Sequence, residues 1–599
     1  MDDYESHEHD VMVVGAGGAG LRAAIEAAAQ GASVALVCKS LLGKAHTVMA
    51  EGGAAAALGN VRPEDNWKVH FRDTIRGGKM LNDWRMAQLL TQEAPDQILE
   101  LERWGAVFDR TPDGKISQRP FGGHTYQRLC HVGDRTGLEM IRTLQDHAVH
   151  QDKIEVFMEC TLTGLLKDGN RIAGGLGYWR ESGRFVVFKA KAVVLATGGI
   201  GKAWKTTSNS WEYTGDGISM AFAAGADLMD LEFTQFHPTG MIWPPSVRGI
   251  LVTESVRGDG GVLKNSEGER FMFRYVPEAF LDETAATEEE ADAWLEDNLN
   301  NRRPPDLLTR DVVARAILAE AKAGRGSPHG GALLDIASRR PPDFIRRKLP
   351  SMYHQFKELA GVDITKEPME VGPTYHYSMG GIRVDADTAA ATVPGLFASG
   401  EVAAGLHGAN RLGGNSLSDL LVFGRRAGLG AAEYARKLHT APVVDRGQVE
   451  EVSRAALAPL ERASGENPYN LHEELQETME EYVGIIRTEE ALQQGVARLE
   501  KLKQQAGLVK ATGTRHYNPG WHLAIDLHSL LTMSEAVARA ALERKESRGA
   551  HTRDDFPDYD PHFAKVNVVV RLVDGEMRIL QEPLPQIPQE LRELIEEET

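Results

Sequence analysis

The sequence predicts an α/β protein with a doubly wound, Rossmann-like domain, an inserted α+β domain and a C-terminal helical domain. Three observations predict it. A strand, a glycine-rich turn, a helix and a second strand follow one another at the start of the chain, glycine turns recur after two later strand-like segments, and the last third is rich in helical patterns. At about 150 residues per domain, 599 residues suggest about four units.

The first element is the apolar run DVMVV at 10–14, which is followed by the motif GxGxxG at Gly15, Gly17 and Gly20. A helical pattern then runs to Gly31. In this motif the first glycine permits a tight turn, the second lets a pyrophosphate approach the backbone, and the third permits close packing of helix against strand. The N-terminus of the helix supplies N–H groups to the phosphates. The pattern therefore predicts a dinucleotide site.

The second strand, SVALVC at 33–38, ends without the acidic residue that binds a ribose hydroxyl in standard NAD sites. Lys39 and Ser40 stand there instead. This departure argues against a standard NAD site and indicates a dinucleotide that is held by other contacts.

Later segments repeat the strand-and-turn pattern. Residues 154–190 alternate around glycine turns, as antiparallel strands do, and 192–201 is a buried strand that runs into Thr197-Gly198-Gly199. Residues 394–415 return to this pattern with Ser399-Gly400-Glu401. We expect one sheet that the chain re-enters after an insertion.

The remaining segments are mixed. The pattern predicts an amphipathic helix over 308–326, preceded by an acidic stretch at 281–306 that we interpret as an exposed surface insertion. Helical patterns fill 445–505 and 529–547. The tail, 563–599, contains one strand-like run followed by proline-rich and acidic residues.

Composition excludes several functions. The formal net charge of −19 disfavours binding of nucleic acid or anionic lipid. The three cysteines form no CxxC pair, so an iron–sulfur cluster, a four-cysteine zinc site and a disulfide scaffold are not expected, and a reducing compartment fits. No apolar run reaches the length of a membrane span, and the acidic N-terminus resembles neither a secretory signal nor a transit peptide.

Eight strings in the chain resemble the flavoprotein subunit of succinate dehydrogenase and fumarate reductase. The resemblance covers nearly the whole chain. The strings are KAHTVMAEGG (44–53), TGDG (214–217), QFHPTG (235–240), TESVRGDGG (253–261), TRDVVAR (309–315), PTYHYSMGG (373–381), ASGEVAAGLHGANRLGGNSLSDLLVFG (398–424) and RKESRGAH (544–551).

The resemblance implies FAD that is bound covalently through His46, which precedes Thr-Val and a glycine pair as in the family. L-aspartate oxidases share much of the scaffold and lack this histidine. The resemblance and the glycine motif together give the following expected FAD contacts: Gly15, Gly17, Gly18, Gly20, Lys39, Ser40, His46, Thr47, Gly52, Gly53, Asp216, Glu401, Ser416 and Leu417.

The resemblance also implies a C4 dicarboxylate substrate, succinate or fumarate. His237, Thr253, His376 and Arg411 match the residues that bind its carboxylates, and arginine suits this task because its planar fork meets a carboxylate bidentately. Arg310 matches the proton-transfer residue, with Glu254 and Arg257 as its relay toward solvent. An arginine can exchange protons only where neighbouring charges and desolvation make its neutral form reachable. No metal ligands are expected.

Two features depart from the family pattern near these residues. Fifteen residues separate His237 from Thr253, a few more than expected, so this loop is expected to differ in shape. Ser255-Val256 stands between Glu254 and Arg257 where the family often has cysteine. We therefore expect thiol-alkylating reagents not to inactivate through this site.

The physiological direction stays open. Glu51 stands where dehydrogenases often have glutamine and fumarate reductases glutamate; a charged carboxylate there lowers the flavin potential and favours fumarate reduction. The leading hypothesis is succinate oxidation. Fumarate reduction, a soluble L-aspartate oxidase-like flavoenzyme, and a flavin-binding scaffold or nucleic-acid-modifying flavoprotein without dicarboxylate chemistry are the alternatives.

The absence of a cluster motif implies that a separate iron–sulfur subunit takes the electrons. We expect membrane anchor subunits to hold the chain peripherally at the cytoplasmic face of the cell membrane and quinone to be reached through these partners. The expected domains are an FAD-binding domain at 1–240 and 360–435, a capping domain at 241–359 that closes over the substrate, a helical domain at 436–545 and a C-terminal segment at 546–599.

Overall fold

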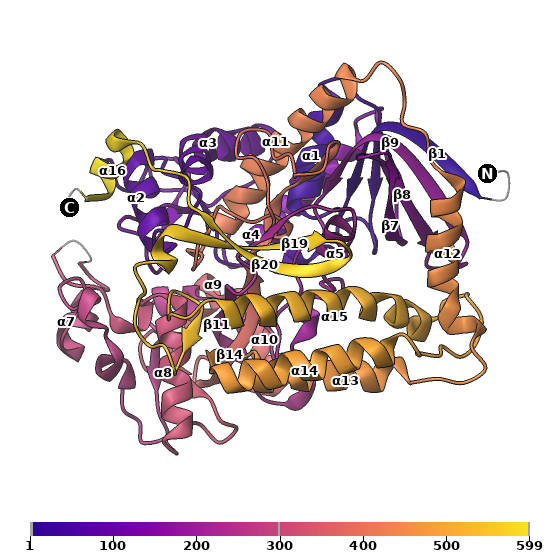
Figure 1. Ribbon diagram of the computed structural model, residues 1–599. Helices are drawn as coiled ribbons and strands as arrows, with labels where there is room; N and C mark the ends of the chain where they lie inside the picture. Colours follow the sequence, from indigo (N-terminus) through magenta and orange to yellow (C-terminus); the bar gives the residue numbers. More distant parts are fainter. Residues whose placement is uncertain (1–3, 298–299, 597–599) are drawn as a thin grey trace.

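A computed structural model of the chain describes residues 4–297 and 300–596 (Figure 1). Its largest sheet has seven strands. In order across the sheet these are β6 (Ile154–Phe157), β2 (Val34–Val37), β1 (Glu5–Val14), β9 (Phe185–Leu195), β8 (Arg171–Trp179) and β7 (Cys160–Asp168), with β16 (Leu396–Ala398) also beside β9.

The glycine-turn strands share this sheet. β1 is parallel to β2 and β9, and β16 is parallel to β9 after about 200 intervening residues. The prediction of one sheet that the chain re-enters is therefore confirmed. The two strand patterns that the sequence separates near residue 190 form one continuous strand, β9, whose earlier half pairs with β8 and whose later half pairs with β16.

Two helices pack tightly beside this sheet. α1 (Gly18–Ala29) lies against α11 (Asn415–Lys437), and Figure 1 shows them next to each other. A Cβ atom at Gly428 of α11 would lie 2.2 Å from the carbonyl oxygen of Ala23, so only glycine permits this approach. This packing places the N-terminus of α11 close to the glycine motif at the start of α1.

A second sheet and its own hydrophobic core follow. The sheet has the order β11 (Thr234–Met241), β14 (Met369–Ser378), β13 (Ala332–Asp335) and β12 (Val262–Lys264). The core cluster runs from Met241 to Val371 and includes residues of α8 (Arg310–Lys322). A separate core is in keeping with the predicted capping domain, although β11 crosses its predicted start and β14 lies beyond its predicted end at residue 359.

The helical patterns in the last third form four main helices and a tail. α12 (Arg446–Glu461), α13 (Pro468–Tyr482), α14 (Glu489–Ala506) and α15 (Pro519–Glu543) fill the predicted region, and Figure 1 shows α13, α14 and α15 running side by side. The remaining helices of four or more residues and the other strands are β3 (Ala54–Ala55), α2 (Trp67–Gly77), α3 (Trp84–Arg103), β4 (Gln118–Arg119), β5 (Leu129–Cys130), α4 (Thr136–Val149), α5 (Asp216–Ala223), β10 (Leu228–Met229), α6 (Ser255–Gly258), α7 (Glu288–Ala293), α9 (Pro342–Lys348), α10 (Pro350–Ala360), β15 (Gly381–Ile382), β17 (Ile486–Arg487) and β18 (Thr552–Arg553).

Two sequence predictions need correction. The tail holds more than one strand: β19 (Val566–Val573) forms a hairpin with β20 (Glu576–Pro583), and α16 (Gln589–Glu596) packs Leu591 and Ile595 against α2. The acidic stretch at 281–306 is exposed at 281–283 and 286–289, but residues 284, 285 and 291 and its last three residues, 304–306, are buried. The local composition does not predict that residues 304–306 pack against the core of the inserted unit.

A buried charge cluster ties the C-terminal segment to the start of β11. The guanidinium of Arg544 is fully buried and contacts Glu232, Glu546 and, at 3.7 Å, Asp230. Removing one partner of a buried ion pair leaves uncompensated charge, which costs about 3–5 kcal/mol.

We therefore expect Arg544→Met to lower the melting temperature clearly, as followed by scanning fluorimetry. The matched control is Arg539→Met, because Arg539 lies on α15, which ends immediately before Arg544, pairs with Glu500 and Glu535, and is one-third exposed. Exposed pairs contribute about 0–1 kcal/mol. Equal small shifts for both variants would contradict the prediction.

Candidate active site

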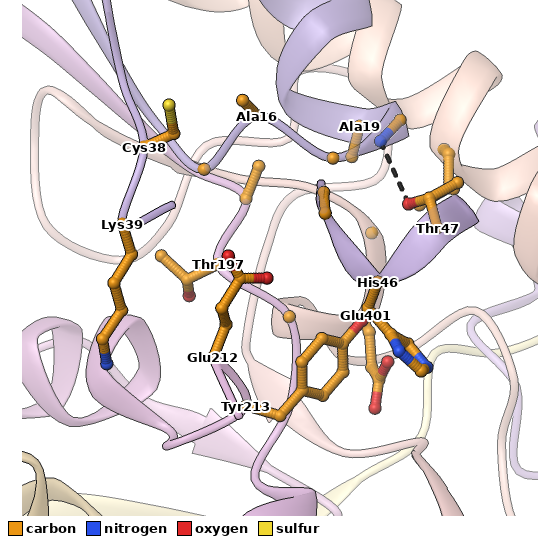
Figure 2. A pocket seen from close by; sticks show the side chains of 18 of the residues that line it. Ala16, Ala19, Cys38, Lys39, His46, Thr47, Thr197, Glu212, Tyr213 and Glu401 are labelled. Atoms are coloured by element: carbon orange, nitrogen blue, oxygen red, sulfur yellow. Dashed lines mark hydrogen bonds between the residues drawn. The ribbon is translucent and has the colours of Figure 1, made fainter. Parts of the chain in front are cut away.

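A cleft opens where the carboxyl ends of the parallel strands meet the inserted unit. It encloses about 1320 Å³ counting its open mouth. Its lining comes from segments far apart in the sequence: the glycine motif, the end of β2, the loop before η1 (His46–Met49), the turn after β9, and residues on both sides of the start of α11. Figure 2 shows side chains from several of these segments around the cleft.

The glycine motif forms the tight turn that the sequence predicts. Gly15 has a φ of +106°, and a Cβ there would lie 2.3 Å from the carbonyl oxygen of Ala196. The N–H of Gly18 donates to Thr47 Oγ1 at 3.2 Å, the dashed line in Figure 2. Gly15, Gly17 and Gly18 line the cleft, whereas Gly20 lies outside the lining and packs against the backbone of Gly15.

His46 lies at the cleft wall as a neutral imidazole. Burial lowers the pKa of His46 to about 4. Its Nε2 lies 3.2 Å from Nδ2 of Asn209, and its ring meets Tyr213 edge-to-face with centroids 4.7 Å apart (Figure 2). Nδ1 is buried and has no hydrogen-bond partner among the described residues. A neutral imidazole keeps a lone pair, which covalent attachment of a cofactor requires.

Lys39 lies in the cleft lining, but its ammonium is already paired. Nζ donates to Thr214 at 2.9 Å, to Asp216 at 3.2 Å and to Asp526 of α15 at 2.7 Å. Burial alone would lower the pKa of Lys39, but the two carboxylates outweigh it and raise this pKa. Lys39 thus fixes Asp216 and anchors the helical domain to the cleft.

The other expected cofactor contacts fall into two groups. Ser40, Thr47, Asp216, Glu401, Ser416 and Leu417 line the cleft. Gly52 and Gly53 lie outside the lining; a Cβ at Gly52 would lie 2.6 Å from the Phe121 ring, and one at Gly53 would lie 2.8 Å from the carbonyl oxygen of Cys130. Close packing accounts for these two glycines.

The surroundings of Glu51 disfavour the charge that the sequence argument assumed. Its side chain is buried, and desolvation, with a further contribution from Asp134, raises the pKa of Glu51 well above its usual range. Glu51 also lies outside the cleft lining. The electrostatic reason for favouring fumarate reduction is therefore weakened.

The cleft fits an elongated dinucleotide. Several buried polar atoms of lining residues lack a hydrogen-bond partner within 4–297 and 300–596: His46 Nδ1, Thr197 Oγ1, Ser399 Oγ and Arg411 Nε. Such groups are costly unless a partner satisfies them. Backbone N–H groups of the glycine motif at one wall and polar groups at the other suit a pyrophosphate and a flavin ring.

The predicted substrate residues converge at one end of this cleft. His376 and Arg411 belong to its lining, and the rings of His376 and His237 lie 5.2 Å apart between centroids. His237, Thr253 and Arg310 are buried and lie outside the lining. His376 is also held by Ser208, whose Oγ lies 2.8 Å from Nδ1. The extended loop after His237 contributes Leu251 to the lining.

Gln235 connects Arg310 with Arg411 and is a site residue that the sequence reasoning missed. Its Oε1 accepts hydrogen bonds from Arg310 Nη1 at 3.2 Å and from Arg411 Nη2 at 3.0 Å. Its Nε2 donates to Asn410 and to the carbonyl oxygen of Arg411. The residue stands in the quoted string QFHPTG, where only the histidine was singled out. Asn209 and Ser208 were missed in the same way.

The site carries positive charge. Arg257, Arg310 and Arg411 are buried around the carboxylate of Glu254, and the buried carboxylate of Asp306 also acts on Arg257. Burial raises the pKa of Glu254, but Arg310 and Arg257 outweigh it and lower this pKa, so Glu254 is ionised. Guanidiniums therefore outnumber the carboxylates of this cluster. Burial and the nearby Arg310 lower the pKa of Arg411 to about 10, so this guanidinium is still charged at neutral pH.

The three residues of the predicted relay contact one another around Glu254. Arg310 Nε donates to Glu254 Oε2 at 3.1 Å, and Arg257 Nη2 lies 3.9 Å from the same oxygen. The N–H of Gly122 donates to the other oxygen, Oε1, at 2.8 Å. Glu254 therefore sits between two guanidiniums in a fixed orientation.

We expect iodoacetamide to leave the activity unchanged. Cys38, Cys130 and Cys160 are buried and free, and burial raises the pKa of the Cys38 thiol to about 12, so the reactive thiolate is scarce. Val256, which is buried between Ser255 and Arg257, stands where the family often has cysteine. The variant Val256→Cys is expected to become sensitive and to be protected by succinate. Rapid inactivation of the parent protein would contradict this.

Comparison with known proteins places the chain among flavoproteins. Residues 10–417 match the family described as FAD binding domain, and residues 472–591 match the family described as fumarate reductase flavoprotein C-term. The chain is 43% identical to a subunit of the fumarate reductase (CoM/CoB) of Methanothermobacter marburgensis over 96% of this chain and 99% of that protein. It is 39% identical to the succinate dehydrogenase flavoprotein subunit of Coxiella burnetii over 94% of each.

Solved structures agree with this fold. Mycobacterium smegmatis Sdh1 in complex with UQ1 is 59% identical, with a TM-score of 0.85 over 98% of this chain and 96% of that chain. A quinol fumarate reductase flavoprotein of E. coli is 34% identical, with a TM-score of 0.89 over 98% of each. The sequence resemblance and the predicted α/β fold are confirmed.

Proposed function

Because the chain belongs to the family of succinate dehydrogenase and fumarate reductase flavoproteins, we propose that its cleft holds FAD covalently through His46 and interconverts succinate and fumarate beside it. FAD binding and oxidoreductase activity follow from the family. The observation that carries the substrate proposal is the buried cluster of Arg257, Arg310, Arg411 and Glu254, in which guanidiniums outnumber carboxylates, as suits a dianion.

We assign separate roles in substrate binding and charge stabilisation to residues of this chain. Arg411 and His376 bind the carboxylate nearest the cleft, and His237 and Thr253 bind the other one. When bound, FAD supplies two-electron chemistry at the substrate carbon. The positive cluster stabilises negative charge that develops on the substrate, and Gln235 keeps Arg310 and Arg411 in fixed orientation.

Arg310 exchanges the proton of the neighbouring substrate carbon. Arg257 and Arg411 lie in the same cluster as Arg310, so their guanidiniums repel that of Arg310. Glu254 accepts a hydrogen bond from Arg310. Glu254 is therefore placed to take up or return the proton that Arg310 exchanges.

Turnover assays with the purified holoprotein test this function. Succinate with phenazine methosulfate as acceptor measures oxidation, and fumarate with reduced methyl viologen measures reduction. We propose succinate oxidation as the main activity, with fumarate reduction as the alternative; the ratio of the two rates decides between them. An FAD-loaded protein that turns over neither diacid would overturn the proposal, and L-aspartate oxidation without covalent flavin would favour the aspartate oxidase-like alternative.

We expect binding of fumarate to change less than about threefold between pH 6 and 8. Burial, then the positive charge of Arg310, lowers the pKa of both His237 and His376 well below the ordinary value. A lowered histidine pKa means that protonation begins only in acid, so both rings stay neutral across this range. Titration of the flavin absorbance with fumarate measures this. A steep loss of binding from pH 6 to 8 would assign a protonated histidine to the site.

The proposed partners follow from the chemistry. The relatives are named as subunits, and no helix within the described ranges is long and apolar enough to cross a membrane. The proposal includes an iron–sulfur subunit that takes single electrons, membrane anchor subunits that hold the chain peripherally at the cytoplasmic face, and quinone reached through them. Purification from native membranes with identification of the co-purifying chains tests this.

A further inference from the structure

A line of alternating charges continues beyond Glu254 toward the surface. Arg257, which faces Glu254, donates from Nη1 to the backbone carbonyl of Asp306. The carboxylate of Asp306 is buried; its Oδ1 accepts from the N–H of Leu263 at 2.8 Å, and its Oδ2 lies 3.7 Å from Nη2 of Arg270. The charge of Arg257 therefore acts on two carboxylates, Glu254 on one side and Asp306 on the other.

The line ends in the acidic stretch at 281–306. Arg270 Nη1 donates to Asp292 at 2.9 Å and lies 3.6 Å from Glu288. The side chains of Asp292 and Glu288 are 38% and 60% exposed, whereas that of Arg270 is 5% exposed. The stretch thus connects a buried carboxylate at its end, Asp306, with solvent-facing carboxylates in α7.

Several buried polar atoms along this line have unused hydrogen-bonding capacity. Asp306 Oδ2, Arg257 Nε and Nη2, and Arg270 Nε are buried and make no hydrogen bond to other residues that the structure describes. Burial raises the pKa of Asp306, although Leu263, Arg270 and Arg257 oppose this. A carboxyl that protonates more readily than usual is suited to passing a proton at neutral pH.

We propose that Asp306, with Asp292 and Glu288 at its outer end, forms the solvent side of the proton relay that serves Arg310. The inference rests on the proposed function and gives the acidic stretch a role. During succinate oxidation Arg310 gives a guanidinium proton to Glu254 and takes up the substrate proton in its place. By the same exchange at Arg257 the proton passes from Glu254 to the Asp306 carboxylate, and by exchange at Arg270 it passes to Asp292 and Glu288, which release it to water. Each carboxylate returns to its ionised form, and fumarate reduction uses the same path inward; only a proton moves.

Asp306→Asn tests the inner step, because the amide keeps an acceptor for Leu263 and leaves the backbone carbonyl that Arg257 contacts. We expect kcat for succinate oxidation to fall about tenfold or more, with KM for succinate within about twofold of the parent. The solvent deuterium isotope effect on kcat is expected to rise, because proton transfer becomes slower than the other steps. A purely structural role would not raise this isotope effect.

The outer end has its own test. The double variant Glu288→Gln/Asp292→Asn changes partly exposed side chains, and we expect it to lower kcat about threefold and to raise the solvent isotope effect. Two matched controls are expected to keep parental kcat and isotope effect. Asp335→Asn removes a carboxylate on β13 that pairs with Lys264 of the neighbouring strand β12 at 2.7 Å. Glu290→Gln removes a carboxylate of the acidic stretch at 281–306 that pairs with Arg302.

The outcomes are distinguishable. A parent holoprotein without turnover overturns the proposed function and this inference together. An active parent whose Asp306→Asn and Glu288→Gln/Asp292→Asn variants keep the parental isotope effect overturns the inference alone. If Asp306→Asn does not fold, the outer double variant decides: an unchanged kcat and isotope effect contradict the relay, and a lowered kcat with a raised isotope effect supports it.

Discussion

Arg310→Gln is expected to lower kcat by about 10²–10⁴-fold in both directions, because positioned proton transfer contributes that much to catalysis. Arg310 is 8% exposed and donates hydrogen bonds to Glu254 and Gln235. Bulk water therefore cannot take over proton transfer from its guanidinium unless the surrounding side chains rearrange. Glutamine preserves hydrogen-bonding capacity but cannot donate a proton as an acid. Covalent flavin and fumarate binding, followed by flavin absorbance, are expected to persist, with weaker binding because one positive charge is lost.

The matched control for this variant is Arg315→Gln. Arg315 lies on the same α8 and pairs with Asp311 at 3.3 Å, but its other contacts are with Gly549 and Thr552, away from the substrate cluster. We expect its kcat to stay within about twofold of the parent. If Arg310→Gln retained more than about one-tenth of the parental kcat, Arg310 would not be the proton-transfer residue.

His46→Ala is expected to abolish covalent flavin entirely. The parent should show flavin fluorescence that stays with the polypeptide on a denaturing gel, and a peptide containing His46 with the mass of FAD added. The variant should bind FAD that acid precipitation releases, since the glycine motif and Ser416 remain in the cleft. Covalent attachment raises the flavin potential, so succinate oxidation should fall by about tenfold or more while fumarate reduction falls less.

Tyr213→Phe is the control for this second variant. It keeps the aromatic ring that meets His46 edge-to-face but removes the phenol, so covalent flavin should form as in the parent. Flavin that remains attached to the His46→Ala polypeptide would show that another residue forms the link.

The sequence predicts those features that depend on local pattern. Gly15 and Gly17 form the expected turn, and β1, β9 and β16 share the expected sheet, because a buried strand followed by a glycine turn is defined within about ten residues. His46 could be singled out because the surrounding string resembles that of a family. Its neutral state at the cleft wall required the fold, since it follows from burial.

Features that depend on contacts between distant segments could not be predicted. Lys39 pairs with Asp526, which is 487 positions away, and so does not offer a free ammonium to the cleft. Burial disfavours the charge expected on Glu51, and Gln235 becomes a site residue through two arginines from other segments. In each case the electrostatic environment comes from side chains that packing brings together.

A crystal structure of the FAD-loaded protein with malonate, a diacid that cannot be oxidised to an alkene, tests the central claim most directly. The account predicts a bond between the flavin and the imidazole of His46, and malonate with its carboxylates within hydrogen-bonding distance of Arg411, His376 and His237. Flavin that is not attached to His46, together with malonate bound away from these side chains, would contradict it.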